Sequence, residues 1–332
     1  MRIGTVGTGS IVELFLQAVS EIEDISCAAV YSRSEARGRR LAAKFGVTKV
    51  YTDFGQMLAD DGVNWIYIAS PNSLHYEQAR RSLEMGKHVI CEKPFTSTSA
   101  EAADLMDRAE KRGLFLFEAI TTIHLPNFEL IKGKIGELGR IRIVQANYSQ
   151  YSARYDRVLA GEQPNVFNPA FSGGTLVDLN IYNLHFIMGL FGEPLQCKYY
   201  ANKLENGIDT SGSLILQYPG FVASAVGSKD TWGESFVAVQ GERGYLYVNQ
   251  GANGCRSFYI KINGGPAREY NVQGAVEHHD LLRYELLAFK EIYKQGDQKA
   301  YRRLSEHTCS VLKTLEKARH SAGIKYPAYD PG

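Results

Sequence analysis

The first 120 residues alternate short apolar segments with longer helical ones, and this alternation restricts the possible folds more than any other feature. Apolar, partly β-branched segments lie at residues 2–6, 25–31, 64–69, 88–91 and 114–117. Segments with helical spacing separate them, at residues 11–19, 35–45, 74–85 and 98–112. Strands that alternate with helices of this length predict an α/β fold built on a parallel, doubly wound Rossmann sheet.

The pattern changes after about residue 120. Strand-like segments now follow one another across Gly, Asn and Pro turns, at residues 140–151, 196–203, 212–218, 223–227, 235–240, 244–248 and 258–262. Helical segments are fewer, at residues 127–135, 178–191, 276–295 and 303–321. We therefore expect two domains: a Rossmann domain over 1–120, and an α+β domain over 121–332 with a large, mainly antiparallel, open sheet.

Charge and cysteine content exclude several classes of protein. The formal net charge is +1, so nothing predicts binding to nucleic acid or to an anionic membrane. No apolar run approaches the roughly 18 residues of a membrane helix, and no basic and apolar leader follows Met1. The five cysteines are widely spread without a C-x-x-C pair, which argues against disulfides or a zinc site. We expect a cytoplasmic protein.

A glycine-rich turn, Gly7-Thr8-Gly9-Ser10, stands between the first apolar segment and the helical segment that begins at Ile11. A dinucleotide pyrophosphate needs backbone N–H groups at a helix N-terminus, and a turn without side chains in the way. A lone G-x-G is weak evidence, but its place between a strand and a helix predicts a nicotinamide dinucleotide site.

The end of the second strand indicates which dinucleotide is bound. An acidic residue is expected there if the ribose carries a free 2′-hydroxyl, but the chain continues with Ser32, Arg33 and Ser34. Arg33 is suited to stack on the adenine or to bind a 2′-phosphate, helped by Ser32, Ser34 and Arg37, so NADP(H) is preferred and NAD(H) remains possible. The alternative is that these arginines form a solvated helix face.

A lysine and a tyrosine are the candidate proton-handling pair. Lys93, in the motif Cys91-Glu92-Lys93-Pro94, ends a predicted parallel strand, where open α/β sheets place ligands. Asp178 and Tyr182 are four residues apart and share one face of a helix. A nearby ammonium favours phenolate, which suits a tyrosine that relays protons at neutral pH. Asp178 would hold Lys93 or a substrate hydroxyl.

Each of these residues also has a structural interpretation. Glu92-Lys93-Pro94 is a surface turn in that case, Tyr182 a core aromatic and Asp178 a helix cap. His185, one turn beyond Tyr182, is a rival proton carrier. His278 and His279 are adjacent, so they point apart on a helix, and we predict no metal site.

Four motifs together resemble the glucose-fructose oxidoreductase / inositol dehydrogenase (Gfo/Idh/MocA) family over essentially the whole chain. They are Gly7-Thr8-Gly9, Ser70-Pro71-Asn72-Ser73-Leu74-His75, the specific stretch Gly86 to Pro94, and Gly173-Gly174-Thr175-Leu176-Val177-Asp178. Tyr182 is more similar to the glucose-fructose oxidoreductase and dimeric dihydrodiol dehydrogenase branch than to members with histidine there. Asn180 and Phe167 depart from that branch's usual glycine and arginine.

The resemblance implies an NADP(H)-dependent oxidoreductase that acts on the carbinol or carbonyl of a sugar, polyol or trans-dihydrodiol, and a homodimer or homotetramer formed through the C-terminal sheet. Loops at 151–164 and 229–234 would set specificity, with Trp232 and the tyrosines at 148, 151 and 155 as a sugar platform or as core. A catalytically silent NAD(P)-binding sensor is the alternative. The candidate cofactor-binding residues are Gly7, Thr8, Gly9, Ser10, Ile11, Ser32, Arg33, Arg37, Ser70, Pro71, Asn72, His75, Glu92 and Lys93.

Overall fold

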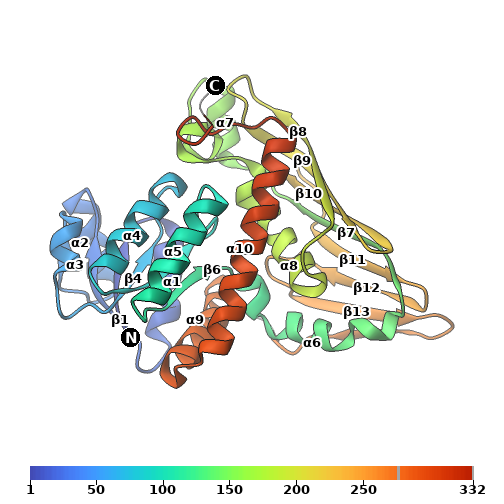
Figure 1. The fold of residues 1–332 in the computed structure, drawn as a ribbon, viewed down its shortest axis with the longest axis horizontal. Coiled ribbons are helices and arrows are strands. Elements are labelled where there is room, and N and C mark those ends of the chain that lie inside the picture. Colours follow the sequence, from blue (N-terminus) through green and yellow to red (C-terminus); the bar gives the residue numbers. More distant parts are fainter. Residues whose placement is uncertain (275–276, 331–332) are drawn as a thin grey trace. The chain divides into compact units, whose positions relative to one another are not determined.

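A computed structural model describes residues 1–274 and 277–330 and divides into two compact units (Figure 1). The first contains Met1–Ala119 and Glu277–Cys309, and the second the described residues of Ile120–Val276 and Ser310–Gly332. Helix α9 (His278–Gln295) and half of α10 (Gln298–Ser321) thus belong to the first unit. The expected division into 1–120 and 121–332 would place both helices in the second. The helix expected over 276–295 begins at a residue that lies outside the described ones. Among the described residues, no helix combines the length and apolar character needed to cross a membrane.

The first unit is built on a six-stranded parallel sheet, of which the sequence predicts five strands and misses the two-residue β3. Its strand order is β3-β2-β1-β4-β5-β6, and every neighbouring pair is parallel. The strands are β1 (Arg2–Val6), β2 (Ser26–Tyr31), β3 (Val50–Tyr51), β4 (Trp65–Ile68), β5 (His88–Glu92) and β6 (Leu116–Ala119). The chain order reverses between β1 and β4, which is where doubly wound sheets bind ligands.

Helices connect these strands and, with α9, build the core of the first unit. They are α1 (Ser10–Ser20), α2 (Glu35–Lys44), α3 (Phe54–Leu58), α4 (His75–Glu84) and α5 (Ser99–Lys111). Phe15 of α1 stacks on Tyr67 of β4, and Phe289 of α9 stacks on Phe117 of β6. The buried face of α9 explains why it belongs to this unit, because no local pattern of the sequence marks which core an apolar helix face will join.

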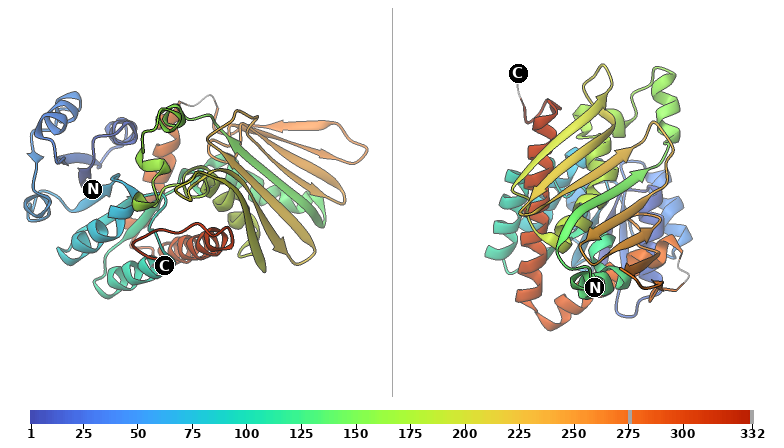
Figure 2. Two further views of the ribbon diagram at one scale, coloured as in Figure 1. Left: turned by 90° about the horizontal axis from the view of Figure 1, so that it is seen from above. Right: turned by 90° about the vertical axis from the view of Figure 1, so that its right-hand side faces the viewer.

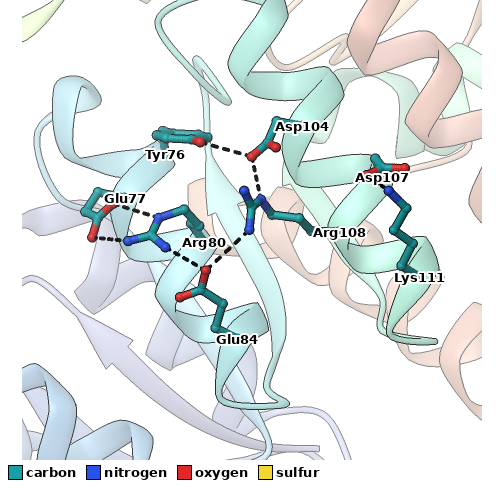
Figure 3. A network of polar contacts seen from close by, with 8 residues as sticks. All are labelled: Tyr76, Glu77, Arg80, Glu84, Asp104, Asp107, Arg108 and Lys111. Carbon is teal, nitrogen blue, oxygen red and sulfur yellow. Dashed lines mark hydrogen bonds and ion pairs between the residues drawn. The ribbon is translucent and has the colours of Figure 1, made fainter.

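An ion-pair network joins α4 to α5 on the surface of the first unit (Figure 3). Arg80 contacts Glu77 at 2.8 Å and Glu84 at 2.6 Å. Arg108 reaches Glu84 from α5 at 3.3 Å and also binds Asp104. These side chains are about a third to a half exposed, so the network orients the two helices more than it stabilises them.

The second unit is built on an eight-stranded mixed sheet that is mostly antiparallel, as expected. Its order is β14-β13-β12-β11-β7-β10-β9-β8, and only the β7–β10 pair is parallel among the described strands. The strands are β7 (Ile141–Ser149), β8 (Gln196–Lys203), β9 (Asp209–Tyr218), β10 (Phe221–Ser228), β11 (Phe236–Gly241), β12 (Gly244–Asn249), β13 (Ser257–Ile262) and β14 (Ala267–Tyr270). The sequence analysis did not identify β14, which is short and charged.

Helices cover one face of this sheet. They are α6 (Pro126–Lys134), α8 (Ile181–Phe191) and the C-terminal half of α10; the same unit contains α7 (Ala153–Leu159), which has no buried residue. A π-helix, Leu176–Asn180, leads directly into α8, where the sequence predicts a continuous helix over 178–191. π-helical turns are rare and are frequently found at functional sites.

The other face of the sheet is open. No described helix lies across its strands, and the right-hand view of Figure 2 looks onto it. Ile143 and Val222 are paired on neighbouring strands and are about half exposed. A hollow of about 480 Å³ lies on the same face, lined by residues that include Phe236, Tyr245 and Tyr247.

Candidate active site

The glycine turn after β1 is shaped by its surroundings to stay free of side chains. Gly7 has a φ of +114°, and a Cβ there would lie 2.7 Å from the carbonyl oxygen of Ala69. Gly9 precedes α1, no side chain caps that helix, and a Cβ on Gly9 would meet nothing within 4 Å. The N-terminus of α1 therefore faces open space. This arrangement fits the pyrophosphate of a nicotinamide dinucleotide.

The residues after β2 also suit a dinucleotide. Arg33 and Arg37 are exposed, and among the described residues neither forms an ion pair, whereas Arg39 is bound to Glu35. Ser32 is buried and its Oγ accepts a hydrogen bond from the Ser34 amide at 3.2 Å, which shapes the turn. No carboxylate follows β2 directly, so a 2′-phosphate would meet cationic side chains here.

The turns after β4 and β5 are tied together by His75. Its Nδ1 lies 2.9 Å from the Pro94 carbonyl oxygen, and its Nε2 lies 3.0 Å from that of Ser70. Burial lowers the pKa of His75, its contacts with the Pro94 and Ser70 carbonyl oxygens oppose this effect, and the ring serves as a local brace. The Lys93–Pro94 peptide bond is cis. Pro71 and Asn72 occupy the turn that begins at Ser70, next to the switch point between β1 and β4.

Three carboxyl groups are buried in the first unit: Glu92 at the end of β5, Glu118 on β6 and Glu285 on α9. Glu92 accepts a hydrogen bond from the Tyr67 hydroxyl at 2.7 Å; burial raises its pKa, against the opposing effects of that bond and of Lys93. Glu285 is 1% exposed and neither of its oxygens has a hydrogen-bond partner. Burial, together with the charges of Glu92 and Glu118, raises the pKa of Glu285 well above its ordinary value.

Asp178 and Tyr182 stand out on the buried helix that carries them. Between Leu176 and Met188, these two residues are partly exposed and all the remaining residues are buried. His185, the rival proton carrier, is fully buried. The Tyr182 ring packs edge-on against Tyr148, with 5.8 Å between ring centroids. The accessible proton-carrying groups of this helix are therefore the carboxylate and the phenol.

The π-helix is anchored by Asp209, which lies at the start of β9 and is buried. Asp209 Oδ2 accepts hydrogen bonds from the Leu176 amide at 2.6 Å and from the Tyr199 hydroxyl at 2.8 Å. A Cβ on Gly174 would lie 2.2 Å from Asp209 Oδ1, and one on Gly173 would lie 2.5 Å from the Val166 carbonyl oxygen. The close approach that the two glycines predict is therefore made to the chain itself.

Asn180 has a clear role in this anchoring. Its side chain donates a hydrogen bond to the Ala225 carbonyl of β10 at 2.9 Å and accepts one from Asn183. Asn183 in turn donates to the Val226 carbonyl. The amides thus attach the π-helix and α8 to the backbone of β10.

Lys229 is the residue that the sequence analysis missed at this position. Its ammonium forms an ion pair with the Asp178 carboxylate, and the two side chains are 8% and 28% exposed. Sequence places Lys229 in a specificity loop, but no spacing rule connects a lysine after one strand to an aspartate on a distant helix. Asp178 and Tyr182 belong to the second unit, whereas Lys93 belongs to the first.

Aromatic residues gather near the end of β7. Trp232 is 73% exposed and stacks on Tyr151 at 6.2 Å between ring centroids, and Tyr155 lies edge-on to Tyr151. Phe167 is buried and contacts the Tyr155 ring. Trp232 is thus a surface ring, and the tyrosines at 148, 151 and 155 are partly exposed, so the sugar platform stays a prediction.

One cluster of potential metal ligands occurs among the described side chains, formed by Glu21, His279 and Asp280. Arg283 lies 3.2 Å from Glu21 and 3.5 Å from Asp280, so both carboxylates already share one guanidinium cation. The side chain of His278 lies outside the described residues. The cluster is an ion-pair network between α1 and α9.

Two family matches cover most of the chain. Residues 1–119 match "Oxidoreductase family, NAD-binding Rossmann fold", and residues 133–247 match "GFO/IDH/MocA C-terminal domain". Scyllo-inositol 2-dehydrogenase (NADP(+)) IolU of Bacillus subtilis (strain 168) is 35% identical over 99% of both chains. Trans-1,2-dihydrobenzene-1,2-diol dehydrogenase of Sus scrofa is 27% identical over 98% of both.

Solved structures share the fold. A 3-ketoreductase from Actinomadura kijaniata in complex with NADP and TDP-benzene superimposes with a TM-score of 0.86, at 22% identity and over 97% of both chains. Levoglucosan dehydrogenase in complex with NADH and levoglucosan gives a TM-score of 0.84, at 17% identity and over 97% of both chains.

Proposed function

Because this chain belongs to the Gfo/Idh/MocA oxidoreductase family and is therefore an NAD(P)-dependent dehydrogenase acting on CH–OH groups, we propose that its substrate is a sugar, polyol or trans-dihydrodiol, and that Lys93 and Tyr182 handle the proton. The observation that carries the proposal is that, between Leu176 and Met188, Asp178 and Tyr182 are the two residues that are partly exposed. The nicotinamide, when bound, accepts or returns the hydride.

Each side chain has a distinct part in this reaction. Tyr182 takes the proton from the substrate hydroxyl during oxidation and returns it to the carbonyl oxygen during reduction. Lys93 orients and polarises that oxygen, and its positive charge favours the phenolate of Tyr182. Asp178 accepts a hydrogen bond from a neighbouring substrate hydroxyl. Trp232 and Tyr151 offer an apolar surface to the substrate ring.

Tyr182→Phe and Lys93→Met test these roles. We expect each variant to lose turnover by about 10²-fold or more, because proton transfer contributes factors of this size, and Tyr182→Phe to bind NADPH as the unmodified protein does. Tyr200→Phe, an exposed tyrosine on β8, is the matched control. Unchanged turnover in Tyr182→Phe would contradict the assignment. A protein that binds NADPH tightly but reduces or oxidises no substrate in a panel of aldoses, inositols and dihydrodiols would instead be a sensor.

The cofactor preferred in this proposal is NADP(H), bound with its 2′-phosphate against Arg33 and Arg37 and its pyrophosphate at Gly7 to Ile11. The turns at Ser70–Asn72 and Glu92–Lys93 hold the nicotinamide end. Support comes from the two exposed arginines without ion pairs and from the absence of an acidic residue directly after β2. Arg33→Ala should weaken NADPH binding at least about 10-fold more than NADH binding in a fluorescence titration, because a charge-assisted contact to phosphate is lost. Equal losses would exclude the 2′-phosphate role.

We propose that the open sheet face joins copies of this chain into a homodimer or homotetramer. Its support is the aromatic and aliphatic surface around Ile143, Val222, Tyr245 and Tyr247, which no described helix covers. We also propose a cytoplasmic location, supported by five free cysteines.

A further inference from the structure

A buried lysine accompanies the candidate carboxylate of the second unit. Lys229 directly follows β10, and its side chain is almost completely buried, yet its ammonium is paired with Asp178. Removing an ammonium from water is costly unless a carboxylate and hydrogen bonds compensate for it. The Asp178 carboxylate is more exposed than its partner, so it presents the solvent-facing side of the pair.

The backbone holds both partners to one residue of β9. The Lys229 amide donates a hydrogen bond to the Thr210 carbonyl oxygen at 2.8 Å, and the Thr175 hydroxyl donates to the same oxygen at 2.8 Å. The Lys229 carbonyl accepts a hydrogen bond from the Ser152 amide at 2.9 Å. Lys229 and the start of the π-helix that bears Asp178 are therefore fixed relative to each other.

The charges around Lys229 point to the same pairing. Asp209 lies deeper; burial raises its pKa to about 6, and the Lys229 ammonium opposes that rise. Asp230, the next residue in the chain, is occupied by hydrogen bonds from Ser211 and Ser228. The Lys229 ammonium thus acts on two carboxyl groups: Asp209, which already accepts two hydrogen bonds, and Asp178, with which it forms the ion pair.

We propose that Lys229 is a positioning residue, which holds the Asp178 carboxylate in the orientation from which it accepts a hydrogen bond from the substrate. This inference rests on the proposed function. Lys229 is too buried to bind the substrate itself, so it acts through Asp178. Without the ammonium, the Asp178 carboxylate loses this ion pair and the orientation that the pair imposes, so the substrate hydroxyl loses a preorganised acceptor.

A double-mutant cycle tests this inference. Asp178→Asn, Lys229→Met and the double variant are compared by kcat and KM for the best polyol substrate, by NADPH affinity, and by thermal unfolding of the ligand-free proteins. Lys132→Met is the matched control, because it removes an exposed lysine whose ammonium lies 3.9 Å from Glu129 in the same unit. We expect each single variant to lose kcat/KM by about 10-fold or more with NADPH affinity unchanged, and Lys132→Met to lose nothing.

The double variant is decisive. If Lys229 acts through Asp178, the double variant is no more than about 3-fold worse than Asp178→Asn alone, because the partner of Lys229 is already absent. Penalties that multiply, or normal activity in a folded Lys229→Met protein, overturn the inference. If Lys229→Met does not fold, the double variant, in which neither charge of the pair remains, is still compared with Asp178→Asn, and a loss beyond about 3-fold overturns the inference.

Failure of the proposed function is distinguishable from failure of this inference. A wild-type protein without turnover on any substrate overturns the proposed function and the catalytic part of this inference, whereas a non-additive thermal cycle in the ligand-free protein would still support the pair. A wild-type protein that turns over, with multiplying penalties in the cycle, overturns the inference alone.

Discussion

Glu285 provides the sharpest test of how the first unit is stabilised. Its carboxyl group is buried on α9 without a hydrogen-bond partner, and its pKa is raised by burial and by the charges of Glu92 and Glu118. In the folded protein it therefore keeps its proton above the pH at which the unfolded chain has lost it. A group of this kind stabilises the protein below its unfolded pKa, and that contribution is lost as the pH rises toward the folded pKa.

Glu285→Gln removes this dependence and keeps the size of the side chain. One proton of difference between folded and unfolded states changes the free energy of unfolding by about 1.4 kcal/mol per pH unit. Between about pH 6 and about pH 8, the free energy of unfolding of the variant should therefore rise relative to that of the unmodified protein by up to about 2.7 kcal/mol. This rise continues for as long as Glu285 in the folded protein keeps its proton. The other titrating groups occur in both proteins, so their direct contributions cancel in the difference.

The measurement is urea unfolding at several pH values, followed by tryptophan fluorescence. The chain has two tryptophans, so a Trp232→Phe background leaves buried Trp65 of β4 as a reporter of the first unit. Glu291→Gln, an exposed position on the same helix, is the control and should follow the parent at every pH. Parallel stability curves for Glu285→Gln and the parent would refute the reasoning, because they would mean that Glu285 titrates alike in both states.

Three further predictions concern other parts of the chain. Gly174→Ala should destabilise the second unit by about 3 kcal/mol in thermal unfolding, because its Cβ would collide with Asp209 and its φ is +120°. Gly161→Ala, which has open space around it, should cost about 1 kcal/mol in the same assay. Arg80→Ala should cost less than about 1 kcal/mol, and the loss should vanish at high salt in the same assay, because its ion pairs are partly exposed. Tyr247→Glu should lower the mass measured by light scattering if the open sheet face joins copies of the chain; an unchanged assembly would exclude that face.

The sequence predicts those parts of the fold that depend on local pattern. The alternation of strands and helices, the glycine turn before α1 and the series of strands after residue 120 all follow from periodicity and turn residues, and the structure confirms them. The placement of α9 in the first unit does not, because its apolar stripe is equally compatible with either core. For the site, the residue types of Asp178 and Tyr182 and their spacing of four residues were enough to predict them as a pair from the sequence.

Long-range contacts explain what the sequence could not reveal about the candidate site. Lys229 reaches Asp178 only because β10 ends beside the π-helix, and that neighbourhood depends on strand order. The π-helix itself depends on Asp209, which holds the Leu176 amide from another part of the chain. Neither contact leaves a local signature that spacing rules detect.

The contact between Gly174 and Asp209 has a consequence for changing this protein by design. Both positions are filled by residues that depend on each other: a larger residue at 174 needs a shorter one at 209, and a shorter one at 209 leaves the Tyr199 hydroxyl and the Leu176 amide without their acceptor. A larger residue at 174 is also strained by the φ of +120°, so shortening residue 209 does not by itself make room for it. Libraries that aim at new substrates should leave both positions unchanged.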